Sequence, residues 1–302
     1  MRDHETSGYL LLNKKQGLTS FEALRPVKKA FSTGKVGHTG TLDRFAAGLL
    51  LVLVNRAVKL APWFSGSDKH YEGTVRFGLE TDTLDPEGVL VAEGAIPSQE
   101  RIQEALSQFR GDILQAPPAY SALHIQGERA SVLARSGKAV EMQKRPVSVY
   151  ALELRSYLPP EAVLYVHCSK GTYIRSLARD IAVAAGSRAH LGALTRTRIA
   201  GFHVSDAVDG EDSSGLIQAL RPVDVKTLEA LGLPYFIVSD EAVCKMLHGN
   251  PPEGFIAGEA LRGQIKQKDF HAAGVVRRDG EMLGILEKKA GIWRYGYVYA
   301  RD

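Results

Sequence analysis

The segment from Lys35 to Leu50 holds the residues best suited to chemistry on a bulky polar ligand. It includes three glycines, Gly37, Gly40 and Gly48. Glycine lets the backbone approach a ligand closely, and the hydroxyls of Thr39 and Thr41 can meet ribose or phosphate oxygens, as can nearby backbone N–H groups. The same segment carries one carboxylate, Asp43, which is able to act as a nucleophile. Taken alone, Asp43 is better interpreted as a helix N-cap or a turn carboxylate than as a catalytic group.

The basic residues are concentrated in two regions of the chain. The 302 residues are 44% hydrophobic and 24% charged, which is typical of a folded protein, and the formal net charge is only +4. Residues 1–60, however, hold ten Lys or Arg against four Asp or Glu, and residues 165–202 hold six against one. This distribution permits a nucleic-acid partner without requiring one.

Several classes of site are excluded by what the sequence lacks. The two cysteines, Cys168 and Cys244, are too few for a disulfide framework and lack the paired spacing of a zinc site. Neither a dinucleotide-binding glycine motif nor a P-loop is present. The acidic residues of 81–88 do not have the spacing of a calcium loop, so an acidic turn is favoured there over a metal site. His167 and Cys168 are neighbours on a predicted strand, where they point to opposite faces and cannot form a catalytic pair.

The sequence shows neither a signal peptide nor a membrane span. The only apolar run near the N-terminus covers residues 9–12, whereas a signal peptide needs about seven or more apolar residues. No stretch approaches the roughly 20 apolar residues of a membrane helix. We therefore expect a cytoplasmic protein without a membrane partner.

Strands and helices alternate without a strict period, which predicts an α/β or α+β fold with a mixed sheet. Thr19 to Glu22 is a capping box that opens a helix, and Pro26 predicts a kink or a late start in that helix. Ser98 to Phe109 predicts a second helix, and Thr172 is expected to cap a third one. The predicted strands cover residues 8–13, 49–54, 70–77, 147–155 and 162–169.

Two domains are predicted, over residues 1–235 and 236–302. The length suggests about two domains at typical sizes of roughly 100 to 200 residues. From Phe236 onward the pattern shifts to short β segments, which makes a small β-barrel plausible. Within it, Asp279-Gly280 is the signal of a type I′ hairpin turn.

Five blocks of sequence resemble the TruB family of pseudouridine synthases, which act on the T-loop of transfer RNA. The block Gly37-His-Thr-Gly-Thr-Leu-Asp43 is similar to the family's G-H-T-G-x-L-D signature, which carries its catalytic aspartate. The other four follow in the family's order: Asp68 to Glu72, Pro117 to Leu123, Cys168 to Arg175, and Gly192 to Phe202. The resemblance covers residues 8 to about 203. It implies a pseudouridine synthase fold with a mainly antiparallel central sheet flanked by helices, followed by a PUA-like C-terminal module.

The resemblance implies that Asp43, Tyr71 and Arg175 carry the catalysis. Asp43 would be the nucleophile, attacking C1′ or C6 or assisting departure of the base, and these routes stay open here. An arginine within hydrogen-bond range lowers the pKa of an aspartate by about one to three units, so Arg175 would keep Asp43 ionised. Without the motif, Arg175 is better interpreted as a surface ion pair on a solvated helix face.

The family places further residues around a flipped-out uridine. Tyr71 and Tyr173 would hold the base, with Tyr71 stacking on it and relaying a proton, and Leu194 would close the apolar side. His38 would occupy the position that the base vacates. For the tyrosines and Leu194 the alternative interpretation is ordinary core packing.

Basic side chains would contact the phosphates of the RNA, above all Lys14, Lys35 and Arg196. The implied partner is the T-stem-loop of tRNA, with uridine 55 as the target, and the isomerisation needs neither a cofactor nor a metal. The resemblance favours a monomer. One departure is Arg44, which stands where the family has proline and is expected to point outward.

Two other functions are kept as alternatives. The first is a non-catalytic chaperone that folds tRNA by opening the T-loop. The second is a pseudouridine synthase that acts on another RNA.

Overall fold

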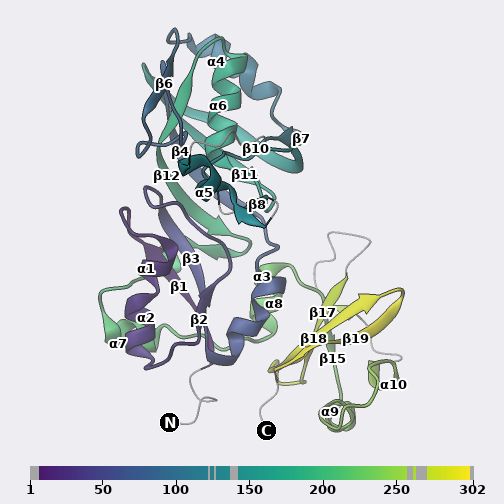
Figure 1. Cartoon of the computed structure of the whole chain (residues 1–302). Helices are drawn as coiled ribbons and strands as arrows, with labels where there is room; N and C mark the ends of the chain where they lie inside the picture. Colours follow the sequence, from purple (N-terminus) through teal and green to yellow (C-terminus); the bar gives the residue numbers. More distant parts are fainter. Residues whose placement is uncertain are drawn as a thin grey trace. The chain divides into compact units, whose positions relative to one another are not determined.

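The computed structural model describes residues 7–121, 123–125, 127–136, 142–256, 261–262 and 271–299. By its internal contacts the chain forms two compact units (Figure 1). The first comprises residues 1–43, 48–67 and 198–302, and the second comprises 44–47 and 68–197. Each unit is a mixture of strands and helices, so the predicted mixed fold is confirmed.

The first unit is built on the hydrophobic strands β1 (Gly8–Lys14) and β3 (Ala47–Val54). They pair antiparallel, from Gly8 opposite Val54 to Lys14 opposite Gly48. The short strand β2 (Val36–His38) pairs antiparallel with β3, while β14 (Val208–Asp209) pairs parallel with β1. The strand β13 (Phe202–His203) pairs with Arg198 and Ile199, the last residues of β12 (Ala189–Ile199). The sheet is therefore mixed but mainly antiparallel, as predicted.

Short helices cover this sheet. They are α1 (Ser20–Ala23), α2 (Arg25–Ala30), the 3₁₀ helices η1 (Asn55–Leu60) and η2 (Val204–Asp206), α3 (Ala61–Phe64), α7 (Ser213–Gln218) and α8 (Val225–Leu231). The predicted capping box is present, since Thr19 and Glu22 bond each other's backbone N–H groups. The late start expected from Pro26 is also confirmed, because α2 begins at Arg25 with the proline in its first turn.

A second sheet lies in the C-terminal part of the first unit. Its hydrogen-bonded order is β16 (Leu261–Arg262), β15 (Tyr235–Ile237), β17 (Ala272–Val276), β18 (Met282–Lys289) and β19 (Ile292–Val298). Helices α9 (Asp240–Leu247) and α10 (Glu253–Ile256) lie between β15 and β16 in the chain. The predicted shift to β structure is confirmed, and closure into a barrel stays a prediction. The domain boundary between 235 and 236 also stays a prediction, although β15 begins one residue before it.

The hairpin between β17 and β18 is present, but the predicted type I′ turn is wrong. That turn needs positive φ at both central residues, whereas Gly280 has φ 92° and Asp279 does not have positive φ. Instead, the N–H of Gly280 donates to the carbonyl of Arg277 at 3.0 Å, which closes a turn one residue earlier. The N–H of Arg277 donates to the carbonyl of Glu281 at 2.8 Å, so Gly280, with its positive φ, lies just before the residue that closes the hairpin. The strand register shifts further along β18, at Leu283.

The second unit is built on one long sheet with the order β12 (Ala189–Ile199), β4 (Lys69–Phe77), β11 (Glu161–Cys168), β10 (Arg145–Leu158) and β7 (Gly111–Gln115). Helices α4 (Gln99–Ser107) and α6 (Ile174–Ala184) lie side by side in this unit (Figure 1). As predicted, Ser98 caps α4. The smaller elements are β5 (Leu79–Thr81) with β6 (Leu90–Glu93), β8 (His124–Ile125) with β9 (Glu128–Arg129), and α5 (Ala130–Arg135). Among the described residues, no helix is long and apolar enough to cross a membrane.

One hydrophobic cluster joins the two sheets of the first unit. It includes Leu51 of β3, Phe64 of α3, Leu228 of α8, and Met282 and Ile285 of β18. Each of these five side chains is fully buried. The C-terminal sheet therefore shares its core with the N-terminal sheet.

This shared core predicts that Met282→Ala destabilises the first unit as a whole. Removing a fully buried methionine side chain costs about 2 to 5 kcal/mol of unfolding free energy, and Met282 is 0% exposed. Denaturant unfolding followed by fluorescence and circular dichroism measures the loss. Leu247→Ala is the control, because Leu247 is 49% exposed and its truncation should cost less than about 1 kcal/mol. Equal stability of the two variants would contradict the shared core.

Candidate active site

Helix α6 presents Arg175 to the interior of the second unit. Its apolar stripe of Ile174, Leu177 and Ile181 is buried, as the sequence predicted. Arg175 is only 5% exposed. The alternative interpretation of Arg175 as a surface ion pair is therefore wrong.

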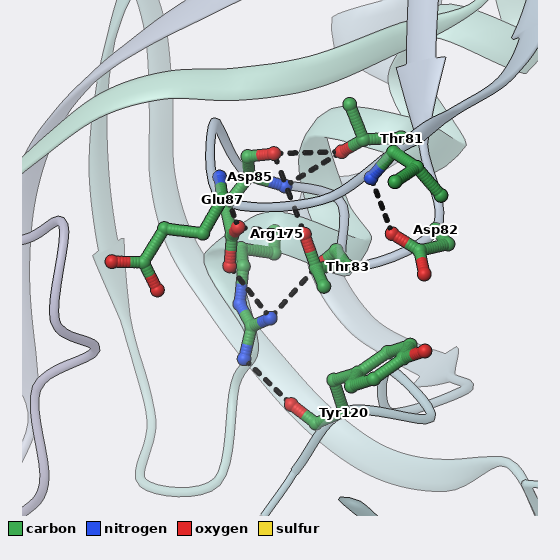
Figure 2. A network of polar contacts seen from close by, with 8 residues as sticks. Thr81, Asp82, Thr83, Asp85, Glu87, Tyr120 and Arg175 are labelled. Carbon is green, nitrogen blue, oxygen red and sulfur yellow. Dashed lines mark hydrogen bonds and ion pairs between the residues drawn. The ribbon is translucent and has the colours of Figure 1, made fainter. Parts of the chain in front are cut away.

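The Arg175 guanidinium is held by one carboxylate and two backbone carbonyls (Figure 2). Its Nη1 lies 3.0 Å from Oδ2 of Asp85 and donates to the carbonyl of Thr83 at 2.7 Å. Its Nη2 donates to the carbonyl of Tyr120 at 3.0 Å. The side chains of Arg175 and Asp85 are both 6% exposed, so water screens this pair little. The contacts fix the position of the guanidinium.

The loop of residues 81–88 positions Asp85 (Figure 2). Oδ1 of Asp85 accepts from the Thr83 hydroxyl at 2.6 Å and from the N–H of Glu87 at 3.0 Å. The Thr81 hydroxyl donates to the Asp85 carbonyl at 2.7 Å and accepts from the Asp85 N–H at 3.1 Å. At Gly88, a Cβ would collide with the Thr83 hydroxyl, so the tight loop requires glycine there.

The loop is thus an acidic turn, as the sequence favoured. Among the described residues, no group of three His, Cys, Asp or Glu side chains could hold a metal ion. The ion pair between Asp85 and Arg175 is the feature that sequence reasoning missed. Its two residues are 90 positions apart in the sequence. The sequence signal that could have pointed to the pair is the acidic, polar turn of residues 81–88.

Tyr173 is anchored through its backbone by Gln115 at the end of β7. Oε1 of Gln115 accepts from the Tyr173 N–H at 2.8 Å, and Nε2 donates to the Tyr173 carbonyl at 3.1 Å. Gln115 is 2% exposed. Tyr173 is also the N-cap of α6, so the prediction that Thr172 caps this helix is wrong. The Thr172 hydroxyl donates instead to the Ser169 carbonyl at 3.0 Å.

The buried face of the second unit's sheet carries three more of the predicted residues. Along β4, Tyr71 is buried between the more exposed His70 and Glu72, as alternation requires. Along β12, Leu194 and Arg196 occupy alternate buried positions. A Cβ built on Gly73 would lie 3.5 Å from Cδ1 of Leu194, which places Leu194 beside the residue two positions after Tyr71. Arg196 is only 1% exposed.

Lys69 is a buried cation on the same strand face as Tyr71. It is 8% exposed, and burial together with the neighbouring Arg196 cation lowers its pKa to about 8. Opposite it on β11 lies Cys168, whose pKa is raised to about 12 by burial. Cys168 is therefore an inert core thiol. The imidazole of His167 stacks instead on His70 with 3.9 Å between ring centres, which confirms that His167 and Cys168 face opposite ways.

Asp43 and His38 belong to the first unit. His38 is the last residue of β2 and is partly buried, and Asp43 is partly buried five positions later. Leu42, just before Asp43, is held by Ser20, whose hydroxyl accepts from the Leu42 N–H at 2.8 Å and donates to its carbonyl at 3.1 Å. Gly48 has φ 104°, a conformation that favours glycine. Arg44 is exposed, as expected.

The two lysines predicted to bind phosphate differ in their surroundings. Lys35 is exposed. Lys14 is 1% exposed, and its Nζ donates to the carbonyls of Leu18 at 2.6 Å and Lys15 at 3.1 Å. The ammonium of Lys14 therefore stabilises the turn that follows β1.

The predicted site residues are distributed over both units. The second unit contains Tyr71, Tyr173, Arg175, Leu194 and Arg196, and the first unit contains Lys14, Lys35, His38 and Asp43. The pairing of Asp43 with Arg175 stays a prediction, since the two residues belong to different units. What the structure adds is a rigid support for Arg175 and Tyr173 within one unit.

Replacing Asp85 with asparagine should destabilise the second unit strongly. The Asp85→Asn change leaves the buried Arg175 guanidinium without its carboxylate, and breaking such a pair costs about 3 to 5 kcal/mol. Denaturant unfolding measures the loss. Glu87→Gln is the control, because the side chain of Glu87 is exposed and only its backbone N–H bonds Asp85. Losses that simply add in an Asp85→Asn, Arg175→Gln double variant would show that the two residues are uncoupled.

Lys69 should make the stability depend on pH between about 8 and 10.5. Its folded pKa of about 8 lies below its usual 10.5, so in this range the unfolded chain binds more protons and stability rises with pH. Relative to Lys69→Met, the wild type should gain about 2 to 3 kcal/mol across the range. Unfolding free energies of both proteins from pH 7 to 10.5 test this. Parallel curves would refute it, and Lys226→Met, at an exposed lysine that is not among the charges acting on Lys69, should reproduce the wild-type slope.

Comparison with known proteins places these features in one family. The sequence profile of the "TruB family pseudouridylate synthase (N terminal domain)" matches residues 28–174. The chain is 41% identical over 295 residues to "tRNA pseudouridine synthase B" of Borrelia garinii, covering 97% of this chain and 98% of that one. It is 36% identical to the protein of the same name from Aquifex aeolicus, covering 94% of this chain and 96% of that one.

A solved structure agrees with this similarity. The fold matches a chain in the "Crystal Structure of a Cbf5-Nop10-Gar1 Complex" with a TM-score of 0.74 and 25% identity, over 98% of this chain and 86% of that one. The sequence blocks, the fold and the near full-length relatives agree, and the chain belongs to the TruB family of pseudouridylate synthases.

Proposed function

We propose that the protein isomerises uridine to pseudouridine in tRNA, at position 55 of the T-loop. Family membership supports the chemistry, and the names of its near full-length relatives support tRNA as the substrate. The structural observation that carries the proposal is the buried Arg175, held by Asp85 and two carbonyls next to the anchored Tyr173. Such an arrangement holds the cation and the backbone of Tyr173 in fixed positions before substrate binds.

The reaction breaks the C1′–N1 bond of the uridine, rotates the base and rejoins it through C5. All atoms of the base stay in the product except that the hydrogen on C5 moves to nitrogen, so the step is redox-neutral. Asp43 is the proposed nucleophile, and Arg175 the residue that keeps its carboxylate ionised. Attack at C1′, attack at C6 and assisted departure of the base are all consistent with these roles.

The base is proposed to stack on Tyr71, whose hydroxyl relays the proton from C5. A phenol suits both tasks, because stacking on an aromatic ring is worth about 1 to 3 kcal/mol per base. Tyr71 is 8% exposed, and Leu194, at 6%, lies on the same buried face. Tyr173 completes the aromatic side of the pocket. His38 is proposed to take the place of the flipped base in the T-loop, which returns part of the few kcal/mol that flipping costs.

The phosphate contacts predicted for Lys14 and Arg196 do not agree with the burial of these side chains, each only 1% exposed. The exposed Lys35 is proposed to bind a phosphate of the T-stem-loop. Such contacts make affinity fall with rising salt concentration. The C-terminal sheet is proposed to be a PUA-like module. The protein is further proposed to act as a monomer in the cytoplasm.

The Asp43→Asn variant tests the proposal against both alternatives. Expressed in a strain that lacks the native gene, the wild type should restore pseudouridine at the T-loop uridine, and the variant should not, because an amide is a far weaker nucleophile than a carboxylate. Pseudouridine mapping of total RNA is the measurement.

Each alternative predicts a different map. Equal modification by wild type and variant would favour the tRNA-folding chaperone. An unmodified T-loop with sites restored in another RNA would favour a different substrate. The Arg44→Pro variant is a control that returns the usual family residue beside Asp43, and it should be active.

A further inference from the structure

A pocket of about 430 Å³ opens in the first unit on the outer side of β1. Three segments line it: residues 12–18 at the end of β1, residues 23–29 of α1 and α2, and residues 210–213 before α7. None of these residues belongs to the catalytic set of Asp43, Tyr71 and Arg175. The volume falls within the range of small-molecule sites.

The floor of the pocket is apolar. Leu12 and Ala23 are buried core residues that form part of its lining, together with Pro26 and Leu18. Leu18 is 40% exposed. The turn that presents Leu18 is held by the Lys14 ammonium, which bonds the Leu18 carbonyl at 2.6 Å. This hydrogen bond therefore holds the backbone of Leu18 in place within the pocket lining.

The rim of the pocket is basic. It carries Lys15, Arg25 and Lys29, all of them exposed, and one lining carboxylate, Glu211. The hydrogen bond with Glu211 raises the pKa of Lys15, and Asp209, just before this lining, also acts on Lys15 and helps to raise it. Next to this rim, Phe21 is 63% exposed and the ammonium of Lys28 lies 4.4 Å from its ring centre. Cations beside exposed apolar and aromatic groups are the combination that binds nucleotides, since the base needs an apolar surface and the phosphate a cation.

One ion pair crosses the pocket rim. Nζ of Lys15 lies 2.7 Å from Oε1 of Glu211, with the two side chains 48% and 78% exposed. An exposed pair contributes little stability, typically about 0 to 1 kcal/mol. A phosphate is able to replace Glu211 as the partner of Lys15.

We propose that this pocket binds a nucleotide, with its base against Leu18 and Pro26 and its phosphate at Lys15, Arg25 and Lys29. The nucleotide comes either from the bound RNA strand or from free nucleotides. Binding of a nucleotide from the RNA strand rests on the proposed function. Binding of a free nucleotide does not. Occupied by RNA, the pocket is a second contact that adds to affinity without taking part in the isomerisation.

Two variants test the apolar and the basic residues of the pocket separately. Leu18→Asn removes the apolar surface without changing charge and should raise the Kd for a tRNA transcript about fivefold. Lys29→Gln removes one phosphate contact and should lower the slope of log Kd against log salt by about 0.7. Leu18→Asn should leave that slope unchanged. Pseudouridine formation at saturating tRNA should keep its rate in both variants.

The controls match each variant in exposure and chemistry. Leu247→Asn changes an apolar side chain that is 49% exposed, and Lys226→Gln changes an exposed lysine. Both lie outside this pocket, and both should leave the Kd within about twofold of wild type. If Leu18→Asn behaves like Leu247→Asn and Lys29→Gln like Lys226→Gln, the RNA strand is excluded as the source of the nucleotide.

Methyl NMR on the full chain identifies the source of the nucleotide. Signals of Leu12 and Leu18 should shift with uridine or adenosine 5′-monophosphate, with the tRNA transcript, or with both. Shifts with the monophosphates alone assign the pocket to free nucleotides, and shifts with the transcript alone assign it to RNA. Unshifted signals with all three probes overturn the proposal. Because binding is measured directly, the result does not depend on whether the wild type forms pseudouridine.

Discussion

The second unit depends on one buried ion pair, between Arg175 and Asp85. Two charges removed from water are costly unless further hydrogen bonds satisfy both groups. Here the carboxylate accepts from Thr83 and the backbone of Glu87, and the guanidinium also donates to the carbonyls of Thr83 and Tyr120. The pair therefore ties the loop of residues 81–88 and the segment at Tyr120 to the first turn of α6. These contacts fix the position of the first turn of α6 in addition to the packing of its apolar stripe.

The first unit is organised by apolar packing rather than by charge. Leu51, Phe64, Leu228 and Met282 come from four separate parts of the chain and share one cluster. Gly274 allows β17 to approach α8 closely, since a Cβ at this position would collide with the Leu228 side chain of α8. A C-terminal sheet attached in this way is part of the unit's core, whatever its own contribution to RNA binding.

Patterns of neighbouring residues predicted the helices and strands well. Contacts between residues far apart in the sequence were not predicted. The capping box at Thr19, the cap at Ser98 and the alternation around Tyr71 depend on residues within a few positions of one another, so the sequence displays them directly. The predicted cap at Thr172 failed because Gln115, 58 positions away, satisfies the start of α6 instead. The role of Asp85 as the partner of Arg175 was not predicted for the same reason. Its neighbours in sequence indicate a turn, and only the fold brings it to Arg175.

Burial of positive charge is the feature that links the structure to an RNA-modifying role. Among the described residues, four basic side chains are buried, those of Lys14, Lys69, Arg175 and Arg196, against the single buried carboxylate of Asp85. Backbone carbonyls, which carry only partial negative charge, serve Lys14 and Arg175 as additional acceptors. Lys69 shows the cost, since burial and Arg196 both favour loss of its proton. Burial of a cation lowers the stability of the free protein unless acceptors compensate for the lost water, and a positive potential raises the attraction for a polyanion. The net charge of +4 conceals this, because most other charges lie on the surface and are screened.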